Sequence, residues 1–222
     1  MNEYIMTNYP EKAKLFIKYK EILKEWNEKI NLTAITKDEE IYEKHFKDSL
    51  LGEKYIEKNS TVLDIGTGAG FPSLPIKIVR EDIKLTLNDS LNKRIVFLNE
   101  VINVLGLKNV RTIHSRAEDL DKKEKYDYVL SRAVARLNTL CEYCLPFVKT
   151  GGYFIAYKSK ETDEEIKEAE KAIKIMGGKI EKIEEIPLND KTIRRLVIIK
   201  KIKECEKKYP RGKNLPKTKP II

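Results

Sequence analysis

Hydrophobic side chains in the first quarter of the chain recur at the three- and four-residue spacing of amphipathic helices. Between residues 11 and 30 they form one apolar stripe on an otherwise charged segment, made of Leu15, Phe16, Tyr19, Ile22, Leu23, Trp26 and Ile30. A second stripe follows, made of Ile41, Tyr42, His45, Phe46, Ser49 and Leu50. Thr36 and Glu39 have the spacing of a capping box at the start of this second helix. The pattern predicts at least two helices before the first strand.

From residue 61 short β-rich runs alternate with segments of helical spacing. The runs predict seven strands, at residues 61–65, 83–87, 109–113, 126–130, 152–157, 180–186 and 194–200. Helices are predicted from the end of the first strand to Val79, and at residues 92–105, 136–147 and 163–176. Such alternation indicates an α/β fold with a mostly parallel sheet covered on both faces. Only the turn-like residues 187–190 separate the last two strands, which should therefore pair antiparallel.

The 222 residues are predicted to form three parts: an N-terminal helical extension (1–58), an α/β domain (59–200) and a basic tail (201–222). The tail has eight Lys and Arg residues against two Glu residues, which gives +6 of the whole chain's +9. Its three prolines exclude a long helix, and we expect an extended arm. Such an arm suits a polyphosphate partner, because each neutralised phosphate releases counterions. A terminus that only keeps the protein soluble explains the charge equally well.

Composition limits where the protein works. No run approaches the roughly 18 apolar residues of a membrane-spanning helix, and the N-terminus lacks the pattern of a secretory signal. A cytoplasmic protein is expected, which suits the three cysteines, too few for a disulfide framework. Cys141 and Cys144 lie in an apolar helical pattern and are expected in the core. With His45 and His114 as the only histidines, no metal site is expected.

Gly66, Gly68 and Gly70 form a turn directly after the first predicted strand, where parallel sheets bind ligands. Glycines there let the backbone approach a ligand closely. The third glycine is misplaced for a dinucleotide fingerprint, and Asp64 stands where its charge would repel a pyrophosphate. A carboxylate at this position suits the positively charged sulfonium and amino group of S-adenosylmethionine. A capping turn with surface acids is the alternative interpretation.

Further candidate cofactor contacts follow the next strands. Asp89, after the second strand, is placed to accept hydrogen bonds from both ribose hydroxyls. Ala117 and Glu118 follow the third strand, and their backbone amides could bind the adenine, although Glu118 could equally begin a helix. Arg132 ends the fourth strand and could contact the cofactor or a substrate phosphate, or lie at the surface.

The segment after the fourth strand, Ser131-Arg132-Ala133, narrows the choice of methyl acceptor. It lacks both the Pro-Pro-aromatic turn that orients an exocyclic amine and the nucleophilic cysteine that carbon methylation needs. A ring nitrogen or an ionised oxygen is left as the acceptor. His45 and Asp48 are spaced to meet on one helical face, where a packing role for His45 is favoured over contact with the substrate.

Six segments carry a family resemblance. They are Asn31-Leu32-Thr33, His45-Phe46-Lys47-Asp48-Ser49, the nine residues from Asp64 to Pro72, Asp89-Ser90, Arg116-Ala117-Glu118 and Ser131-Arg132-Ala133. In this order they resemble the RsmG (GidB) family of bacterial small-subunit rRNA methyltransferases, over about residues 11–200. Phe71-Pro72 after the glycine turn is the most specific element, and residues 208–211 are similar to the tails of Gram-positive members.

The resemblance implies a class I S-adenosylmethionine-dependent methyltransferase fold, which is Rossmann-like, and methyl transfer to ring nitrogen 7 of a guanine in the decoding-region loop of 16S rRNA. By carry-over, the cofactor site would be lined by Gly66, Phe71, Asp89, Ala117, Glu118 and Arg132. Ser73 departs from the glycine usual in the family, and the tail is slightly shorter. Because nitrogen 7 has a free lone pair, no catalytic base is expected. Alignment, with Asp64 and nearby dipoles, should suffice.

Other functions stay open at this point. The chain could methylate another RNA, a protein or a small molecule. Binding of a protein or small-molecule substrate would be insensitive to salt, whereas binding of rRNA should weaken steeply. A nicotinamide oxidoreductase would bind NAD in place of S-adenosylmethionine, and a noncatalytic RNA-binding protein would consume no cofactor. The expected partner is 16S rRNA or the small ribosomal subunit. The oligomeric state is open, with a monomer as the expectation.

Overall fold

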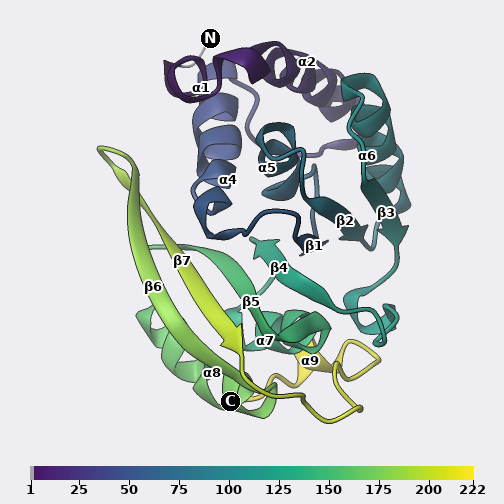
Figure 1. The fold of residues 1–222 in the computed structure, drawn as a ribbon, viewed down its shortest axis with the longest axis vertical. Coiled ribbons are helices and arrows are strands. Elements are labelled where there is room, and N and C mark those ends of the chain that lie inside the picture. Colours follow the sequence, from purple (N-terminus) through teal and green to yellow (C-terminus); the bar gives the residue numbers. More distant parts are fainter. Residues whose placement is uncertain (1–2) are drawn as a thin grey trace.

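The computed structural model describes residues 3–222 and has a seven-stranded sheet at its centre (Figure 1). The strands are β1 (Thr61–Ile65), β2 (Lys84–Asp89), β3 (Val110–His114), β4 (Tyr126–Arg132), β5 (Val148–Ser159), β6 (Gly178–Asn189) and β7 (Thr192–Lys201). They lie in the order β3-β2-β1-β4-β5-β7-β6. The pairs among β1 to β5 are parallel, whereas β7 pairs antiparallel with both β5 and β6. The predicted mostly parallel α/β sheet with an antiparallel last strand is confirmed.

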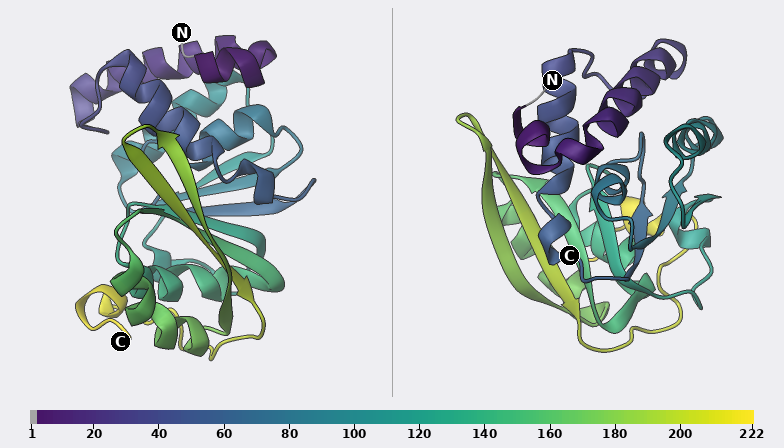
Figure 2. Two further views of the ribbon diagram at one scale, coloured as in Figure 1. Left: turned by 90° about the vertical axis from the view of Figure 1, so that its left-hand side faces the viewer. Right: turned by 45° about the horizontal axis from the view of Figure 1, so that its top comes forward.

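Helices cover both faces of the sheet, so the molecule has three layers, most easily seen in the left view of Figure 2. One layer contains α1 (Glu3–Asn8), η1 (Pro10–Lys12), α2 (Ala13–Ile30), α3 (Asp38–Glu40), η2 (Ile41–Lys47), α4 (Asp48–Leu50), η3 (Glu53–Tyr55), α5 (Ser73–Val79) and α6 (Asn92–Leu105). The other contains η4 (Ala117–Asp119), α7 (Leu137–Cys144), η5 (Leu145–Phe147), α8 (Asp163–Ile175) and α9 (Leu215–Thr218). No helix within residues 3–222 has both the length and the apolar character needed to cross a membrane.

Helix α2 buries the apolar stripe that the sequence predicts. Phe16, Tyr19 and Leu23 are fully buried in the core shared with the sheet. The indole of Trp26 packs edge-on against the ring of Phe97 in α6, with 5.8 Å between ring centroids. At its end the helix is capped by Asn31, whose φ of 50° lies in the left-handed region that asparagine tolerates. The N-terminal helices thus share one hydrophobic core with the sheet.

The second N-terminal helix begins at Asp38, so the predicted capping box is wrong. Its N-cap residue is Lys37, and no side chain caps the helix. Two cations from α2 hold the start instead: Lys24 Nζ lies 2.6 Å from Asp38 Oδ1, and Lys20 pairs with the other oxygen. The middle of this helix, η2, winds as a π-helix. This form is rare in proteins, and where it occurs it often lies at a functional site.

The two faces of the sheet have separate cores. On the face with α7 and α8, Cys141 and Cys144 are fully buried beside Leu63 and Val129. Burial raises the pKa of both thiols, which keeps them protonated and unreactive. Both cysteines are core residues, as predicted. Among residues 3–222 no group of three or more His, Cys, Asp or Glu side chains is arranged to hold a metal ion.

The β6–β7 hairpin is longer than the sequence predicts. Strand β6 continues through Pro187 to Asn189, so the turn lies at Asp190 and Lys191 and not at 187–190. Proline is accepted because β6 is the edge strand of the sheet and the pairing register shifts at that point. The hairpin extends beside the second N-terminal helix (Figure 1), where Lys47 Nζ donates a hydrogen bond of 2.5 Å to the Leu188 carbonyl.

The C-terminal tail is docked, and the predicted extended arm is wrong. Arg211 makes a bidentate pair with Glu142, with Nε 2.8 Å from Oε1 and Nη2 2.7 Å from Oε2. Glu142 is 1% exposed, and the tail's own Tyr209 and Pro216 are also buried. The prediction rested on the charge of the tail, which is typical of a solvated segment. In the structure Tyr209, Pro216 and the buried Glu142 carboxylate hold the tail against α7.

Candidate functional site

The glycine turn lies at the switch in strand order, because β1 has β2 on one side and β4 on the other. All three glycines have positive φ, between 61° and 89°. A Cβ on Gly66 would come within 2.5 Å of Val134, and one on Gly70 within 2.4 Å of Leu74. A Cβ on Gly68 would meet nothing within 4 Å. Two of the glycines therefore permit close packing, and the third leaves the turn open to a ligand.

Asp64 lies beneath this turn and is fully buried. Its Oδ2 accepts a hydrogen bond of 2.9 Å from the Thr67 hydroxyl, whereas Oδ1 is buried without a partner among the described residues. Burial raises the pKa of Asp64 to about 7, opposed by the nearby hydroxyl and amide of Ser73 and by the Thr67 hydroxyl. Of the two hydroxyls only that of Thr67 makes a hydrogen bond, and Ser73 Oγ is buried without a partner among the described residues. A buried acceptor that lacks a donor is the group that a cationic ligand satisfies. The residues at this strand end therefore fit the ammonium group of S-adenosylmethionine.

Asp89 ends β2 and is 2% exposed. Its Oδ2 accepts a hydrogen bond of 2.9 Å from the Gly68 amide, and its Oδ1 accepts one of 2.9 Å from the Leu91 amide. Arg94 adds an ion pair at 3.2 Å. Asp89 therefore holds the glycine turn against the start of α6, a function that the sequence did not indicate. Each carboxylate oxygen can accept more than one hydrogen bond, and the predicted contact with ribose stays a prediction.

A pocket opens beside the turn at the carboxyl ends of β1 to β4. It brings together three of the predicted cofactor residues, Gly66, Ala117 and Glu118. The full lining is Ile65, Gly66, Asn88, Ser90, Ser115, Arg116, Ala117, Glu118, Val134, Ala135, Tyr143, Asn214 and Lys217. Sequence reasoning missed Asn214 and Lys217, because a tail expected to be extended gives no signal of this contact. We call this space the cofactor pocket.

A second pocket of about 430 Å³ lies between η2 and the carboxyl ends of β4 and β5. Its lining is Ile35, Lys44, His45, Asp48, Arg132, Ala133, Tyr157, Lys158, Ser159, Glu165 and Arg194. Arg132, predicted to line the cofactor site, lines this pocket, where its guanidinium lies 5.0 Å from the ring centroid of Phe71. Four cations and two carboxylates therefore face one space. We call it the basic pocket.

Asp48 links the two arginines of the basic pocket. The carboxylate is fully buried, and its two oxygens lie 2.9 Å from Arg132 Nη1 and 2.9 Å from Arg194 Nε. The helical spacing allows a contact between Asp48 and His45, but the structure pairs Asp48 with the arginines. Arg194 was missed because it lies 146 residues away in the sequence.

His45 is a packing residue, as the sequence favoured. Its ring stacks on Phe71, with 4.4 Å between centroids and 12° between planes, and its Nε2 lies 2.9 Å from Thr33 Oγ1. Phe71 itself is 5% exposed and lies under the basic pocket's histidine, outside the lining of the cofactor pocket. Burial and the positive charge of Arg132 lower the pKa of His45 to about 3. At neutral pH the imidazole is therefore uncharged.

We predict that the His45 ring does not titrate between pH 5 and 8. Because its folded pKa lies below the unfolded value of 6.5, the neutral ring stabilises the fold above pH 6.5, and this stabilisation falls as the pH drops toward 3. The NMR shifts of the His45 imidazole across this range measure the effect. A midpoint for His45 near 6.5 would contradict the packing seen here.

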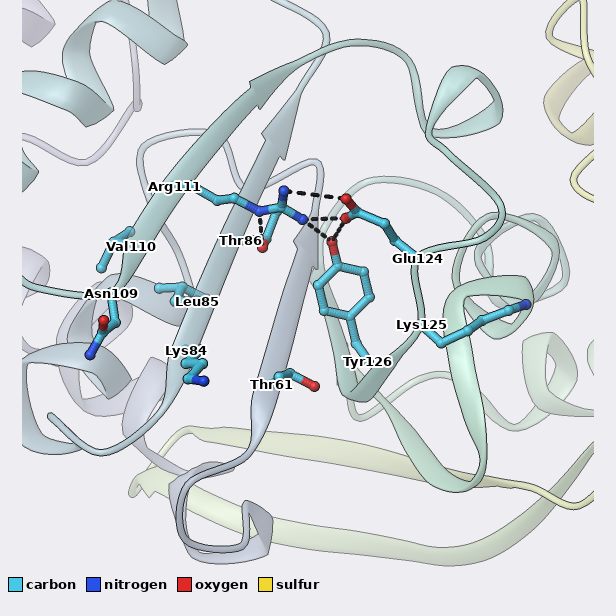
Figure 3. Close-up of a pocket in the computed structure, with 10 residues that line it drawn as sticks. All are labelled: Thr61, Lys84, Leu85, Thr86, Asn109, Val110, Arg111, Glu124, Lys125 and Tyr126. Atoms are coloured by element: carbon cyan, nitrogen blue, oxygen red, sulfur yellow. Dashed lines mark hydrogen bonds and ion pairs between the residues drawn. The ribbon is translucent and has the colours of Figure 1, made fainter.

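A third pocket, of about 460 Å³, lies at the opposite end of the sheet (Figure 3). It is lined by the first residues of four strands, including Thr61, Lys84 and Tyr126. The Arg111 side chain spans it, with Nε 3.0 Å from Thr86 Oγ1 and Nη2 2.8 Å from Tyr126 Oη. This end has no glycine turn and none of the predicted site residues. The predicted cofactor residues therefore lie away from this pocket.

Comparison with known proteins settles the family. Residues 12–196 match the family model described as GidB, rRNA small subunit methyltransferase G. The chain belongs to this family. A ribosomal RNA small subunit methyltransferase G from Clostridium novyi is 51% identical over 219 residues, covering 96% of this chain and 90% of the relative. One from Desulforamulus reducens is 55% identical over 215 residues, with 93% and 89% covered.

Solved structures share the fold. A methyltransferase dependent on S-adenosylmethionine from Aquifex aeolicus has a TM-score of 0.54 and 25% identity, over 73% of this chain and 93% of its own. TYW2 from M. jannaschii, in complex with S-adenosylmethionine, has a TM-score of 0.60 at 16% identity, over 76% and 80%. The predicted RsmG family, class I fold, enzyme class and cofactor are confirmed: the chain is an S-adenosylmethionine-dependent methyltransferase.

Proposed function

We propose that this member of the RsmG family methylates ring nitrogen 7 of a guanine in the decoding-region loop of 16S rRNA. The observation that carries the proposal is the basic pocket, which lies at the same edge of the sheet as the cofactor pocket. Its four cations outnumber its two carboxylates, and the net positive charge suits a phosphate backbone. The relatives are named as methyltransferases of small-subunit rRNA, which supports RNA as the substrate class. A cytoplasmic location and a monomeric state are part of the proposal.

In this proposal S-adenosylmethionine supplies a methyl group made electrophilic by its sulfonium. The unpartnered Oδ1 of Asp64 binds the ammonium group, and the open backbone at Gly68 lets the cofactor approach the turn. Asp89 keeps that turn in place and accepts from the ribose, while Ala117 and Glu118 border the adenine. These residues bind and orient the donor, and alignment of nucleophile, methyl and sulfur provides most of the rate.

No carboxylate or imidazole in the basic pocket is free to remove a proton. Glu165 is paired with Lys158. Asp48 has both oxygens bound by arginines, and the pKa of His45 is about 3. Guanine nitrogen 7 needs no such base, because it is an acceptor with a free lone pair. Arg132 and Arg194 are placed to hold a phosphate beside the methyl acceptor. The residues therefore support methylation of a ring nitrogen in preference to an amine that must lose a proton.

Methyl transfer to purified RNA tests the acceptor atom. The enzyme is incubated with labelled S-adenosylmethionine and small subunits, or naked 16S rRNA, from a strain that lacks the activity, and the modified nucleoside is identified by mass spectrometry. We expect 7-methylguanosine in the decoding region. RNA with 7-deazaguanosine at the target should compete for binding and accept no label. Label in another nucleoside, or in ribosomal protein, would overturn the proposal.

Salt should weaken RNA binding far more than cofactor binding. For about four phosphate contacts, raising the salt from about 50 to 200 mM is expected to raise the RNA Kd roughly 50-fold. The Kd for S-adenosylmethionine should change by less than about twofold, because that site binds a single small zwitterion through buried groups. Fluorescence anisotropy with labelled RNA gives the first value and calorimetry gives the second. Equal and small effects on both would indicate a substrate other than a polyanion.

A further inference from the structure

The docked tail forms one wall of the cofactor pocket. Asn214 and Lys217 line it together with Glu118 and Tyr143, which come from η4 and α7. The Asn214 amide donates a hydrogen bond of 3.1 Å to Glu118 Oε1, and Tyr143 Oη lies 3.4 Å from Asn214 Oδ1. The side-chain nitrogen of Asn214 donates to none of the residues that the structure describes. The pocket is thus bordered by a side-chain amide of the tail whose nitrogen has no acceptor among residues 3–222.

Anchors on both sides of Asn214 fix the tail at this wall. Before it, Arg211 is bound by Glu142 through three hydrogen bonds, from its backbone amide, Nε and Nη2. After it, Thr139 Oγ1 donates a hydrogen bond of 3.0 Å to the Pro216 carbonyl. A buried carboxylate that holds an arginine in a bidentate pair defines orientation as well as position. Specific hydrogen bonds to α7 therefore fix the position of Asn214.

The backbone at this point also suits a ligand contact. Lys213 and Asn214 have φ values of 58° and 57°, in the left-handed region. Asparagine is enriched in that region, whereas lysine is not, so the pair carries some strain. The resulting turn places the Asn214 side chain in the lining of the pocket. The tail thus makes a left-handed turn at the residue that lines the pocket.

We propose that residues 209–219 are part of the cofactor-binding site and that the Asn214 side chain binds the adenine of S-adenosylmethionine. A side-chain amide can donate to adenine nitrogen 7 and accept from its exocyclic amine, a pairing that asparagine makes with adenine elsewhere. The second oxygen of Glu118 has no hydrogen-bond partner among residues 3–222 and is available on the same side. The inference rests on the cofactor-pocket assignment made above.

The tail could bind RNA through its charge or form part of the cofactor site, and these two hypotheses make different predictions. The exposed cations Lys203, Lys207 and Lys208 lie in the tail but outside the cofactor pocket. If the tail acts only through its charge, removing these cations should matter most, and it should affect RNA. If Asn214 binds adenine, an uncharged change at one residue should affect the cofactor alone.

The test uses Asn214→Gly in the full-length enzyme. Glycine keeps the left-handed backbone and the hydrogen bond from the backbone amide of residue 214 to Glu118, and it removes the side chain. Calorimetry without RNA measures binding of S-adenosylhomocysteine and of 5′-methylthioadenosine, which has the adenosine but no amino-acid part. We expect both ligands to bind about 5- to 30-fold more weakly, as for the loss of one or two hydrogen bonds. RNA affinity should be unchanged.

The matched control is the double variant Lys207→Ala, Lys208→Ala, which removes two charges from the same tail and should leave cofactor affinity within about twofold. Glu142→Gln, which loosens the Arg211 anchor, should weaken both ligands and speed trypsin cleavage after Lys213. Wild-type affinity in Asn214→Gly, or equal loss in the lysine variant, would overturn the inference. Failure of the wild-type enzyme to bind either ligand would instead refute the cofactor pocket, and loss of rRNA methylation alone would refute only the proposed substrate.

Discussion

Replacing Asp48 with alanine is expected to lower the free energy of unfolding by about 3–5 kcal/mol. The carboxylate is fully buried between two guanidinium groups, Arg132 and Arg194, each at 2.9 Å. Removing it leaves two cations facing each other next to a partly enclosed pocket, without the charge that neutralises them. Asp48 and the two arginines also join α4 to β4 and β7, so the loss is expected in global stability. Urea unfolding followed by circular dichroism measures it.

The hairpin offers a matched control for this change. Glu185 also pairs with an arginine, with Arg195 Nε 2.8 Å from Oε1, but its side chain is 45% exposed. Glu185→Ala should cost no more than about 1 kcal/mol, because exposed ion pairs are screened by solvent. Asp48→Asn, which keeps the shape, should fall between the two. If Asp48→Ala and Glu185→Ala had equal effects, Asp48 would not organise the basic pocket.

Replacing Asp64 with asparagine is expected to weaken S-adenosylmethionine binding about 10- to 100-fold, the usual cost of losing a hydrogen bond to a charged group. The reason is the unpartnered, buried Oδ1 at the end of β1, which is the acceptor assigned to the ammonium group. Asp121→Asn, an exposed acid outside both pockets, is the control. Binding of 5′-methylthioadenosine, which lacks the ammonium group, should be unchanged in Asp64→Asn, whereas Asn214→Gly should weaken it.

Because the pKa of Asp64 is raised, cofactor binding should release protons. Its folded value of about 7 lies above the ordinary 3.8, so this group stabilises the cofactor-free fold at low pH and loses that effect as the pH rises from about 4 to 7. A bound ammonium group favours the ionised form and should release about half a proton at pH 7. Titrations in buffers of different ionisation enthalpy measure this release. It should vanish in Asp64→Asn, and persistence there would assign the proton to another group.

Local patterns predicted most of the fold. The stripe of α2, the strand ends at Asp64 and Asp89, and the glycine turn depend on neighbours within a few residues, which the sequence displays directly. The family resemblance added the cofactor and the substrate class, and it identified Glu118 as a cofactor-pocket residue that spacing alone left ambiguous.

Contacts between distant residues could not be predicted in this way. Asp48 meets Arg194 across 146 residues, and Glu118 meets Asn214 across 96. The charge of the tail outweighed its few apolar residues in the sequence, although Tyr209 and Arg211 find buried partners in the fold. The predicted capping box failed for a similar reason, because lysines of α2 fix the start of the next helix.

Photo-cross-linking of labelled S-adenosylmethionine to the full-length enzyme, followed by peptide mapping, tests most directly where the methyl donor binds. The label should appear in peptides that contain residues 64–70, 88–90, 115–118 or 214–217, at the carboxyl ends of the strands. Unlabelled S-adenosylhomocysteine should suppress it. Label that is suppressed in the same way but maps to Lys84, Arg111 or Tyr126, in the pocket of Figure 3, would place the donor at the amino ends of the strands and contradict this account.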